Sequence, residues 1–213
     1  MESDNQDILA ILQSSFLFRG LDKEKLQKLA QKARIQAFHA GYHLIHEDEI
    51  NDKIFLILNG TVKIYKTTEK GNEIFLAYER KDNYLGIMDL DRKPASATIE
   101  TLHLSHMLIL YKKDMLSLLQ DNPQLWKNMY EIILAKLREF NHLQGLRLGN
   151  NLYDRTYHIL QFLSRLSENN ILLFSHETIA QIVGATRPRV TEVLHILQKE
   201  KKIIISPKRI VLL

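Results

Sequence analysis

The side chains best suited to intermolecular hydrogen bonding gather between Ser175 and Lys201. Arginine, lysine and histidine can donate to phosphates and bases, whereas hydroxyl and carboxylate groups can accept from base amines. At helical spacing these groups share the outer face of one predicted helix, which suits insertion into a DNA major groove. The outer-face residues are Arg187, Arg189, Thr191, Glu192, His195 and Lys199.

Two short predicted helices joined by a tight turn position these side chains. Ser175 is the predicted N-cap of the first helix, which Gly184 ends. Thr186 caps the second helix, whose first turn tolerates Pro188 because the missing N–H has no partner there. Any pair of helices on a globular surface could show such caps, so the flanking sequence decides between the two interpretations. The predicted inner-face residues are Ile179, Ile182, Val183, Val190, Leu194 and Leu197.

Two β-rich runs, 203–205 and 210–213, follow the helix pair around a polar turn that contains Pro207. They predict a wing whose basic tip holds phosphates while the helix reads bases. Charge favours the same partner, since residues 150–213 hold 9 basic and 5 acidic residues, whereas residues 1–149 hold 20 of each. The whole excess of +4 therefore lies in the C-terminal segment.

Composition narrows the class of protein. The chain has 213 residues, of which 45% are hydrophobic, enough for one large or two modest domains with cores of their own, and we favour two. It contains no Cys, which excludes disulfides, thiolate metal sites and cysteine nucleophiles. The acidic N-terminus lacks the features of a signal peptide, and no apolar run approaches the roughly 20 residues of a membrane span. We therefore expect a cytoplasmic protein without a membrane partner.

Hydrophobic periodicity divides the chain ahead of the helix pair. Residues 7–37 show a helical period, whereas residues 38–111 show short apolar runs punctuated by glycines. Such runs predict a β-sandwich or barrel, in which Asn59-Gly60 and residues 70–72 are hairpin signals. A neutral β-rich module followed by a basic segment is typical of a regulatory domain joined to a nucleic-acid reader.

A long helix is predicted from residue 122 to residue 148, well beyond the mean globular length of about 11 to 12 residues. It carries two apolar seams, of which one, through Leu125 and Met129, is expected to face the β-rich domain. The other recurs at steps of four and three, as in a parallel coiled coil. We favour a homodimer over burial of both seams within one chain, because paired readers bind paired half-sites. The dimer seam contains Trp126, Tyr130, Ile133, Leu137, Phe140, Gln144 and Arg147.

A break in the pattern at residues 149–151 predicts a hinge, and a helix is expected from residue 152 to residue 166. The predicted domains are therefore a sensor over residues 1–121, a dimerisation helix over 122–149 and a DNA-binding domain over 150–213.

Several motifs stand in the order found in one family of bacterial regulators. They are Gly41, the run from Asp52 to Tyr65, Gly71-Asn72-Glu73, Leu85-Gly86, Ser96-Ala97 and the segment from Ile179 to Arg187. With them, the chain resembles the cyclic-AMP receptor protein and FNR (Crp/Fnr) family of transcription regulators over nearly its whole length. The resemblance implies an α+β fold with an N-terminal cyclic-nucleotide-binding-type β-roll, a long dimerisation helix and a C-terminal winged helix-turn-helix.

The resemblance also implies an effector pocket, and there the sequence departs from the nucleotide-binding members. Those members carry Gly-Glu-Leu for the ribose and Arg-Ser-Ala for the cyclic phosphate, where this chain has Gly-Ile-Met and Ala-Ser-Ala. Isoleucine cannot accept from a ribose hydroxyl, and loss of the arginine removes charge-assisted hydrogen bonds to phosphate. On the long helix, a bulky Phe-Asn pair stands where the family contacts adenine. The candidate pocket residues are Gly86, Ile87, Met88, Ala95, Ser96, Phe140 and Asn141.

These departures predict no tight binding of cyclic AMP, although Arg92 and Lys93 are candidate substitutes for the missing arginine. Two modes of control stay open. Either another small molecule binds in the β-roll, or the protein is always competent and is controlled by its amount.

In the reader, the family's base-contacting positions correspond to Arg187, Pro188, Thr191 and Glu192. Arg187 suits guanine, to which it can donate bidentately, and Glu192 can accept from cytosine N4. Pro188 and Glu192 differ from the residues common in the family, so the preferred half-site should differ as well. Helix starts and wing tips face the sugar–phosphate chain. The candidate backbone contacts are Ser175, His176, Arg189, Lys199 and Lys208.

No catalytic constellation, metal site or cofactor is predicted. The sequence has no phosphate-cradling glycine loop with a lysine, no serine nucleophile elbow and no metal-binding triad. His43 and His46, three apart in a predicted strand, are expected on opposite faces of it. His142, His158, His176 and His195 are interpreted as lone histidines on helices that serve as surface or packing groups rather than ligands.

We therefore predict a homodimeric, sequence-specific DNA-binding transcription regulator that acts on a palindromic site and does not respond to cyclic AMP. RNA polymerase and an unidentified small-molecule effector are further candidate partners. One alternative is a regulator gated by cyclic nucleotide, haem or another small molecule in the β-roll. A more distant alternative is a dimeric protein-binding module without DNA function, and an enzyme is the least favoured class.

Overall fold

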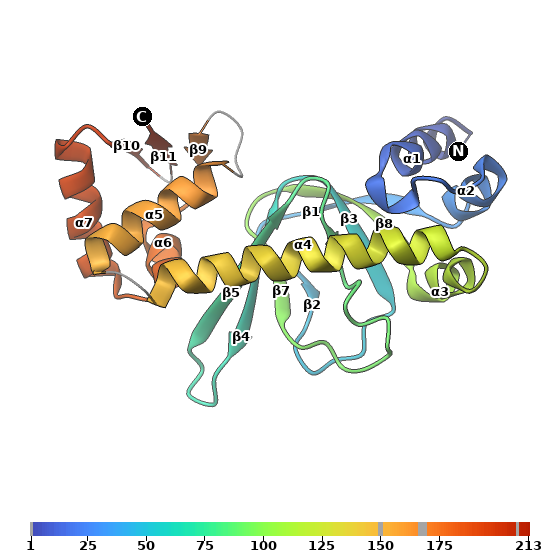
Figure 1. The fold of residues 1–213 in the computed structure, drawn as a ribbon, viewed down its shortest axis with the longest axis horizontal. Coiled ribbons are helices and arrows are strands. Elements are labelled where there is room, and N and C mark those ends of the chain that lie inside the picture. Colours follow the sequence, from blue (N-terminus) through green and yellow to red (C-terminus); the bar gives the residue numbers. More distant parts are fainter. Residues whose placement is uncertain (1, 149–150, 166–169, 208) are drawn as a thin grey trace. The chain divides into compact units, whose positions relative to one another are not determined.

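The chain folds into two compact units (Figure 1). The first holds residues up to 136 except the short segment 73–75, and the second holds that segment and residues 137–213. The long helix α4 (Pro123–Leu148) contributes to both units, so the predicted domain limits at 121 and 149 stay predictions. The residues that the computed structural model describes are 2–148, 151–165, 170–207 and 209–213.

Three short helices lead the chain: α1 (Glu2–Ser14), η1 (Phe16–Phe18) and α2 (Lys23–Ala30). The prediction of helix as far as residue 37 is wrong, because β1 (Arg34–Phe38) follows and pairs antiparallel with β8 (Ser105–Tyr111). In β1 only Phe38 is buried, so the segment lacks the alternation that marks a strand in a sequence. Its backbone groups are satisfied instead by a strand from the far end of the domain.

Among the described residues, eight strands form two four-stranded sheets, which confirms the predicted β-rich domain. One sheet has the order β1-β8-β3-β6 and the other has the order β2-β7-β4-β5. The remaining strands are β2 (His43–Ile45), β3 (Lys53–Asn59), β4 (Thr61–Thr67), β5 (Glu73–Arg80), β6 (Tyr84–Leu85) and β7 (Thr98–Thr101).

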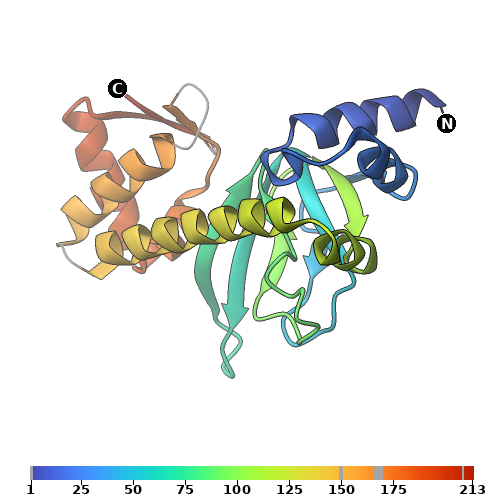
Figure 2. The same cartoon turned by 45° about the vertical axis from the view of Figure 1, so that its right-hand side comes forward.

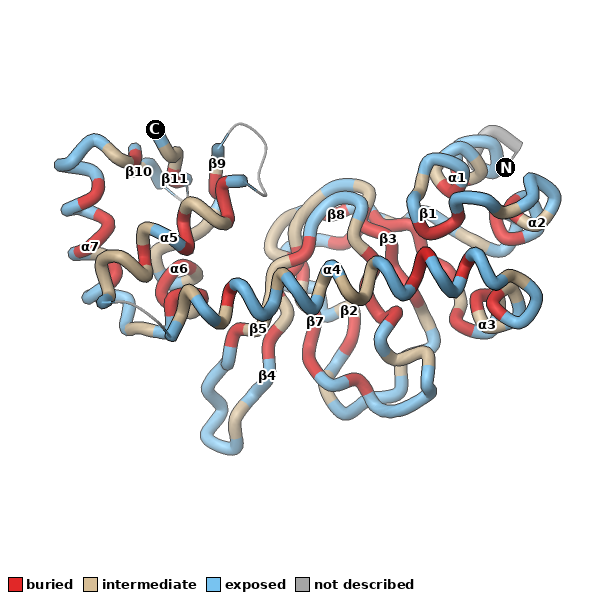
Figure 3. The backbone as a smooth tube through the Cα atoms, in the orientation of Figure 1, coloured by how far each residue is buried: buried red, intermediate tan, exposed pale blue. Residues whose placement is uncertain are grey.

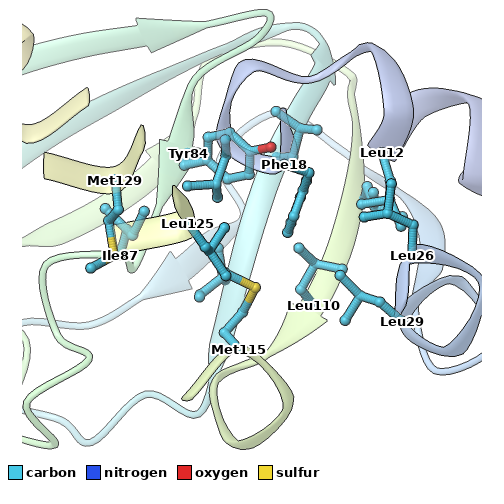
Figure 4. Packing of buried hydrophobic residues seen from close by; sticks show 14 of the residues in the cluster. Leu12, Phe18, Leu26, Leu29, Tyr84, Ile87, Leu110, Met115, Leu125 and Met129 are labelled. Atoms are coloured by element: carbon cyan, nitrogen blue, oxygen red, sulfur yellow. The ribbon is translucent and has the colours of Figure 1, made fainter. Parts of the chain in front are cut away.

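The central strand β3 is buried on both of its faces. Phe55 and Ile57 join a core to which both sheets contribute, called here the inter-sheet core, whereas Ile54 and Leu56 join a second core with the helices. Successive side chains of a strand point to opposite faces, so one strand supplies both cores. Figure 4 shows the helix-covered core, in which side chains of the leading helices pack close to Leu110 of β8.

The turn at Asn59-Gly60 is a corner between the sheets, so the hairpin prediction there is wrong. β3 pairs with β8 and β6, whereas β4 pairs with β7 in the other sheet. Gly60 has a φ of 104°, and a Cβ at this position would lie 2.1 Å from Ser105 Oγ. Hairpin and corner both require glycine, so the sequence does not distinguish them. The hairpin predicted at residues 70–72 is confirmed, because β4 and β5 are neighbours in one sheet (Figure 2).

Two helices follow the last strand of the β-roll. α3 (Lys112–Gln120) has no counterpart in the sequence prediction, since its short period merges with the flanking apolar residues. α4 confirms the long helix predicted from residue 122 to residue 148. Its residues Leu125 and Met129 are buried in the helix-covered core, as expected for the seam that faces the β-rich domain.

The second unit contains the predicted helix pair and wing. Its small sheet has the order β10-β11-β9, in which the very short β9 adds a strand that sequence reasoning missed. The core of this unit includes Ile159 and Leu160 from its first helix. The described elements are α5 (Leu152–Arg165), β9 (Ile171–Leu172), α6 (His176–Val183), α7 (Arg187–Lys199), β10 (Ile203–Ser206) and β11 (Arg209–Leu212).

Three predicted features lie outside the described residues: Gly149 and Asn150 of the hinge, residue 166 at the end of the helix predicted after it, and Lys208 at the wing tip. Within the described ranges, no helix combines the length and the apolar character needed to cross a bilayer.

Candidate nucleic-acid interface and effector site

The caps of the helix pair fix the turn between α6 and α7. Ser175 Oγ accepts a hydrogen bond from the Thr178 N–H at 3.1 Å, as predicted for an N-cap. Gly184 closes α6 with a φ of 70°, in the left-handed region that favours glycine. Thr186 occupies the N-cap position of α7, but its side chain makes no capping hydrogen bond to a described residue. The predicted caps are therefore confirmed in position for both helices and in chemistry for α6.

α7 separates a buried face from an exposed one (Figure 3). Its first turn carries Arg187 and Arg189 and no acidic residue, although the helix dipole disfavours cations there. Among the described residues, no ion pair compensates either guanidinium. Thr191 is half-buried, in contrast to the neighbouring outer-face residues. Those exposed residues are Arg187, Pro188, Arg189, Glu192, His195 and Lys199.

His176 lies at the start of α6 and faces α7. Its Nδ1 lies 3.1 Å from Thr191 Oγ1, and its ring centroid lies 6.3 Å from that of His195. Burial lowers the pKa of His176, and the charges of His195 and Arg187 lower it further. His176 and His195 are therefore not isolated from each other, because the packing of α6 on α7 brings them together, and these contacts are those of the packing groups that the sequence indicated.

Lys202 ties the base of the wing to α5. Its Nζ pairs with Glu200 Oε2 at 2.8 Å, donates to the Tyr153 hydroxyl at 2.7 Å and lies over the rings of Tyr153 and Tyr157. The hydrogen bonds to Glu200 and then to Tyr153 raise the pKa of Lys202. Sequence reasoning missed this residue, because Tyr153 lies 49 residues away along the chain. The positive charge of Lys202 is therefore used in contacts within the second unit and does not belong to the outer face of α7.

The residues predicted to line an effector pocket lie in different surroundings. Ile87 is 3% exposed and belongs to the helix-covered core, where Figure 4 shows it next to Met129. Ala95 is buried in the inter-sheet core, whereas Met88 and Ser96 are exposed. Ile87 therefore does more than remove a ribose acceptor, because its side chain is part of the packing.

Backbone geometry adds a second constraint at the same loop. Gly86 has a φ of 75°, and a Cβ there would lie 2.6 Å from a backbone carbonyl oxygen. Phe140 and Asn141, the remaining pocket candidates, are exposed residues of α4 in the second unit.

A cation does lie beside Ser96, but it already has an anionic partner. Lys66 Nζ donates to the Ser96 carbonyl oxygen at 3.1 Å and pairs with Glu47 Oε1 at 2.7 Å. The hydrogen bond between them raises the pKa of Lys66 and lowers that of Glu47. Because Glu47 would repel an incoming phosphate, Lys66 is not equivalent to the arginine of nucleotide-binding members.

The two candidate substitutes for that arginine have other surroundings. Lys93 Nζ pairs with Asp91 at 3.5 Å. Arg92 lines a cavity of about 430 Å³ whose wall includes neither Ala95 nor Ser96. The residues of that wall are Leu90, Asp91, Arg92, Leu116, Leu119, Gln120 and Trp126.

The prediction that His43 and His46 lie on opposite faces is wrong, since their ring centroids are 5.0 Å apart. β2 ends at Ile45, and its register against β7 shifts between His43 and Ile45, which breaks the alternation of the strand. His43 Nε2 also lies 3.1 Å from the Tyr65 hydroxyl. In the part of the chain that the structure describes, no three His, Cys, Asp or Glu side chains are grouped to hold a metal ion.

The predicted dimer seam runs along α4 as a stripe of exposed apolar side chains. Trp126, Tyr130, Leu137 and Phe140 are 51%, 61%, 52% and 40% exposed, and Ile133 is half-buried. Such a contiguous stripe marks a surface that a partner can cover.

Comparison with known proteins agrees with this architecture. Residues 35–122 match the family model of the cyclic nucleotide-binding domain. Over 197 residues the chain is 24% identical to a cyclic AMP receptor protein of Thermus thermophilus, which covers 92% of this chain and 91% of the relative. That relative is a nucleotide receptor by name, so it belongs to the class from which the pocket sequence departs.

Solved structures share the fold over most of the chain. FixK2 from Bradyrhizobium japonicum has a TM-score of 0.77 at 16% identity, covering 84% of this chain and 92% of its own. A CRP-family transcriptional regulator from Thermus thermophilus has a TM-score of 0.71 at 20% identity, covering 84% and 91%. The sequence matches confirm the predicted resemblance to the Crp/Fnr family, and the solved structures confirm the predicted fold class.

Proposed function

We propose that the chain is a sequence-specific DNA-binding regulator of transcription that acts as a homodimer. The outer face of α7 carries the proposal, because Arg187 and Arg189 have no ion-pair partner there among the described residues, while the opposite face anchors the helix in the core. The helix dipole disfavours positive charge in the first turn. The presence of two arginines there is therefore best explained by an anionic partner outside the chain. DNA supplies both phosphates and guanine acceptors to such a face.

The proposed roles follow position on the helix pair. Arg187, Thr191 and Glu192 offer a donor fork, a hydroxyl and an acceptor to base edges, and Pro188 lies against them without a hydrogen bond. The remaining basic and helix-start residues are assigned to the sugar–phosphate chain. Those residues are Ser175, His176, Arg189, Lys199 and Lys208.

Two readers are proposed to act together through the α4 seam. A C2 dimer places the same seam of both chains in contact, and its two α7 helices then face half-sites about 34–36 Å apart. The exposed 4-3 spacing of large apolar residues supports this arrangement.

Arg187→Ala is expected to weaken binding to the preferred duplex by about 1 to 3 kcal/mol and to relax the preference at one base pair of each half-site. The loss follows from removing a bidentate donor that reads one base. Selection from a random duplex library, followed by titration of the selected sequences, measures both effects.

Lys199→Ala is the matched control, because Lys199 is an exposed cation on the same helix. It should weaken all duplexes alike and reduce the salt slope by about one. An unchanged preferred sequence in Arg187→Ala would contradict the placement of the reading face. Salt-insensitive binding to a protein, with no duplex affinity, would favour the protein-binding alternative.

The proposed regulator does not respond to cyclic AMP. Isothermal titration of the dimer with cyclic AMP is expected to show no binding in the micromolar range, because Ile87 and Ala95 are packed in cores and Lys66 is paired with Glu47. Titration of the same sample with its DNA site checks that the protein is intact. Micromolar or tighter binding of cyclic AMP would favour the effector-gated alternative.

A further inference from the structure

The Thr191 hydroxyl is held by a second helix. Of the four base-reading candidates, all of them described, Thr191 is half-buried and the others are exposed. Its Oγ1 lies 3.1 Å from Nδ1 of His176, the first residue of α6. In a helix a threonine hydroxyl commonly turns back to a carbonyl oxygen three or four residues earlier. The contact with His176 draws it across to α6 instead.

The His176 ring is held in place by two side chains of α7. Its ring meets that of His195 edge to face, with centroids 6.3 Å apart and planes at 76°. His195 lies one helical turn after Thr191 on α7, so both neighbours of the ring come from the reading helix. Burial of His176 against these residues limits the directions that the ring can adopt.

We propose that His176 is a positioning residue for Thr191, which fixes the direction of the Thr191 hydroxyl and thereby sets the base that Thr191 selects. This inference rests on the proposed function. It gives His176 a role in specificity, which replaces the phosphate contact predicted from sequence and assigned to His176 in the proposed function above.

The chemistry of a hydroxyl explains how its direction becomes a preference. A threonine hydroxyl has one proton and two lone pairs, and a free one accepts from or donates to any base edge within reach. If it donates to His176, its lone pairs are left for a base amine such as adenine N6 or cytosine N4. If it accepts from His176, its proton is left for guanine O6 or thymine O4. In the first case the bound hydroxyl can only accept from DNA. In the second case its proton and its one remaining lone pair point in fixed directions. Loss of His176 leaves the hydroxyl free to rotate in either case.

The test compares His176→Ala, Thr191→Val and the double variant in the full-length dimer. Binding is measured to duplexes that carry each of the four base pairs at the position where Thr191→Val alters the preference. The parent should favour one pair by roughly three- to tenfold, the size of one net hydrogen bond. His176→Ala should lose most of that preference, while its affinity for the disfavoured duplexes stays within about threefold of the parent. The double variant should be no less selective than Thr191→Val alone.

Two conservative variants separate positioning from mere packing. Asparagine offers a polar atom close to the place of Nδ1, so His176→Asn should restore the preference. Glutamine offers one nearer the place of Nε2, so His176→Gln should not. Thermal unfolding of each variant shows whether the domain is intact. If His176→Ala does not fold, the comparison of His176→Asn with His176→Gln tests whether His176 positions Thr191.

Several outcomes overturn the proposal. A uniform loss of affinity in His176→Ala, with a salt slope smaller by about one, would make His176 a phosphate contact. An unchanged base preference in Thr191→Val would show that Thr191 does not read DNA, and an unchanged preference in His176→Ala would show that His176 does not set the preference of Thr191. If the parent itself bound no duplex selectively, the proposed function would fail as well, which none of the variant results alone would imply.

Discussion

Leu137→Glu is expected to convert the proposed dimer to a monomer and to lower affinity for the proposed palindromic duplex by about 100-fold or more. Leu137 lies in the middle of the α4 seam and is 52% exposed within one chain, so its replacement disturbs that chain little. In the dimer the change appears on both copies, and two carboxylates would be buried close together without partners. Sedimentation equilibrium measures the mass, and titration with full and half-site duplexes measures the loss of bivalent binding.

Arg138→Glu provides the control, because Arg138 is exposed and follows Leu137 on α4 but stands outside the 4-3 seam. It adds the same carboxylate, yet the dimer should persist. Circular dichroism should report folded protein for both variants. A dimeric Leu137→Glu protein would mean that the apolar stripe is covered by something other than a second copy of the chain.

Local chemistry made part of this fold predictable. Ser175 and Gly184 delimit α6 through interactions within a few residues, and those boundaries followed from residue type. The corner at Gly60 and the strand β1 did not, because each depends on which distant strand is paired. A glycine in the sequence indicates that the backbone turns there, but it does not indicate which sheet the next strand joins.

The candidate site divides in the same way. The outer face of α7 was predictable, because it is the complement of the buried positions Val190, Leu194 and Leu197 on one helix. The link from His176 to Thr191 joins two helices across a turn, so neither residue marks it in the sequence. At the effector loop, the sequence identified the missing carboxylate and guanidinium but not the burial of Ile87. The effect of having isoleucine in place of the family's glutamate therefore depends on how Ile87 packs, which the sequence alone does not show.

Gly60→Ala is expected to destabilise the β-roll by about 2 to 6 kcal/mol, through two separate terms. A φ of 104° lies outside the region that an alanine readily adopts. The new Cβ would also meet Ser105 at 2.6 Å from its Cβ and 2.8 Å from its backbone Cα, which belongs to the buried strand β8. Urea unfolding followed by fluorescence of Trp126, the single tryptophan of the chain, measures the loss in the first unit.

Gly41→Ala separates the two terms. Gly41 has a φ of 80°, but nothing lies within 4 Å of a Cβ built there, so only the backbone cost of about 1 to 2 kcal/mol applies. The difference between the two variants is then the cost of forcing a side chain against β8 at the point where the chain passes from one sheet to the other. Equal losses in the two variants would mean that the left-handed backbone, and not the close approach to Ser105, is what requires glycine at this corner.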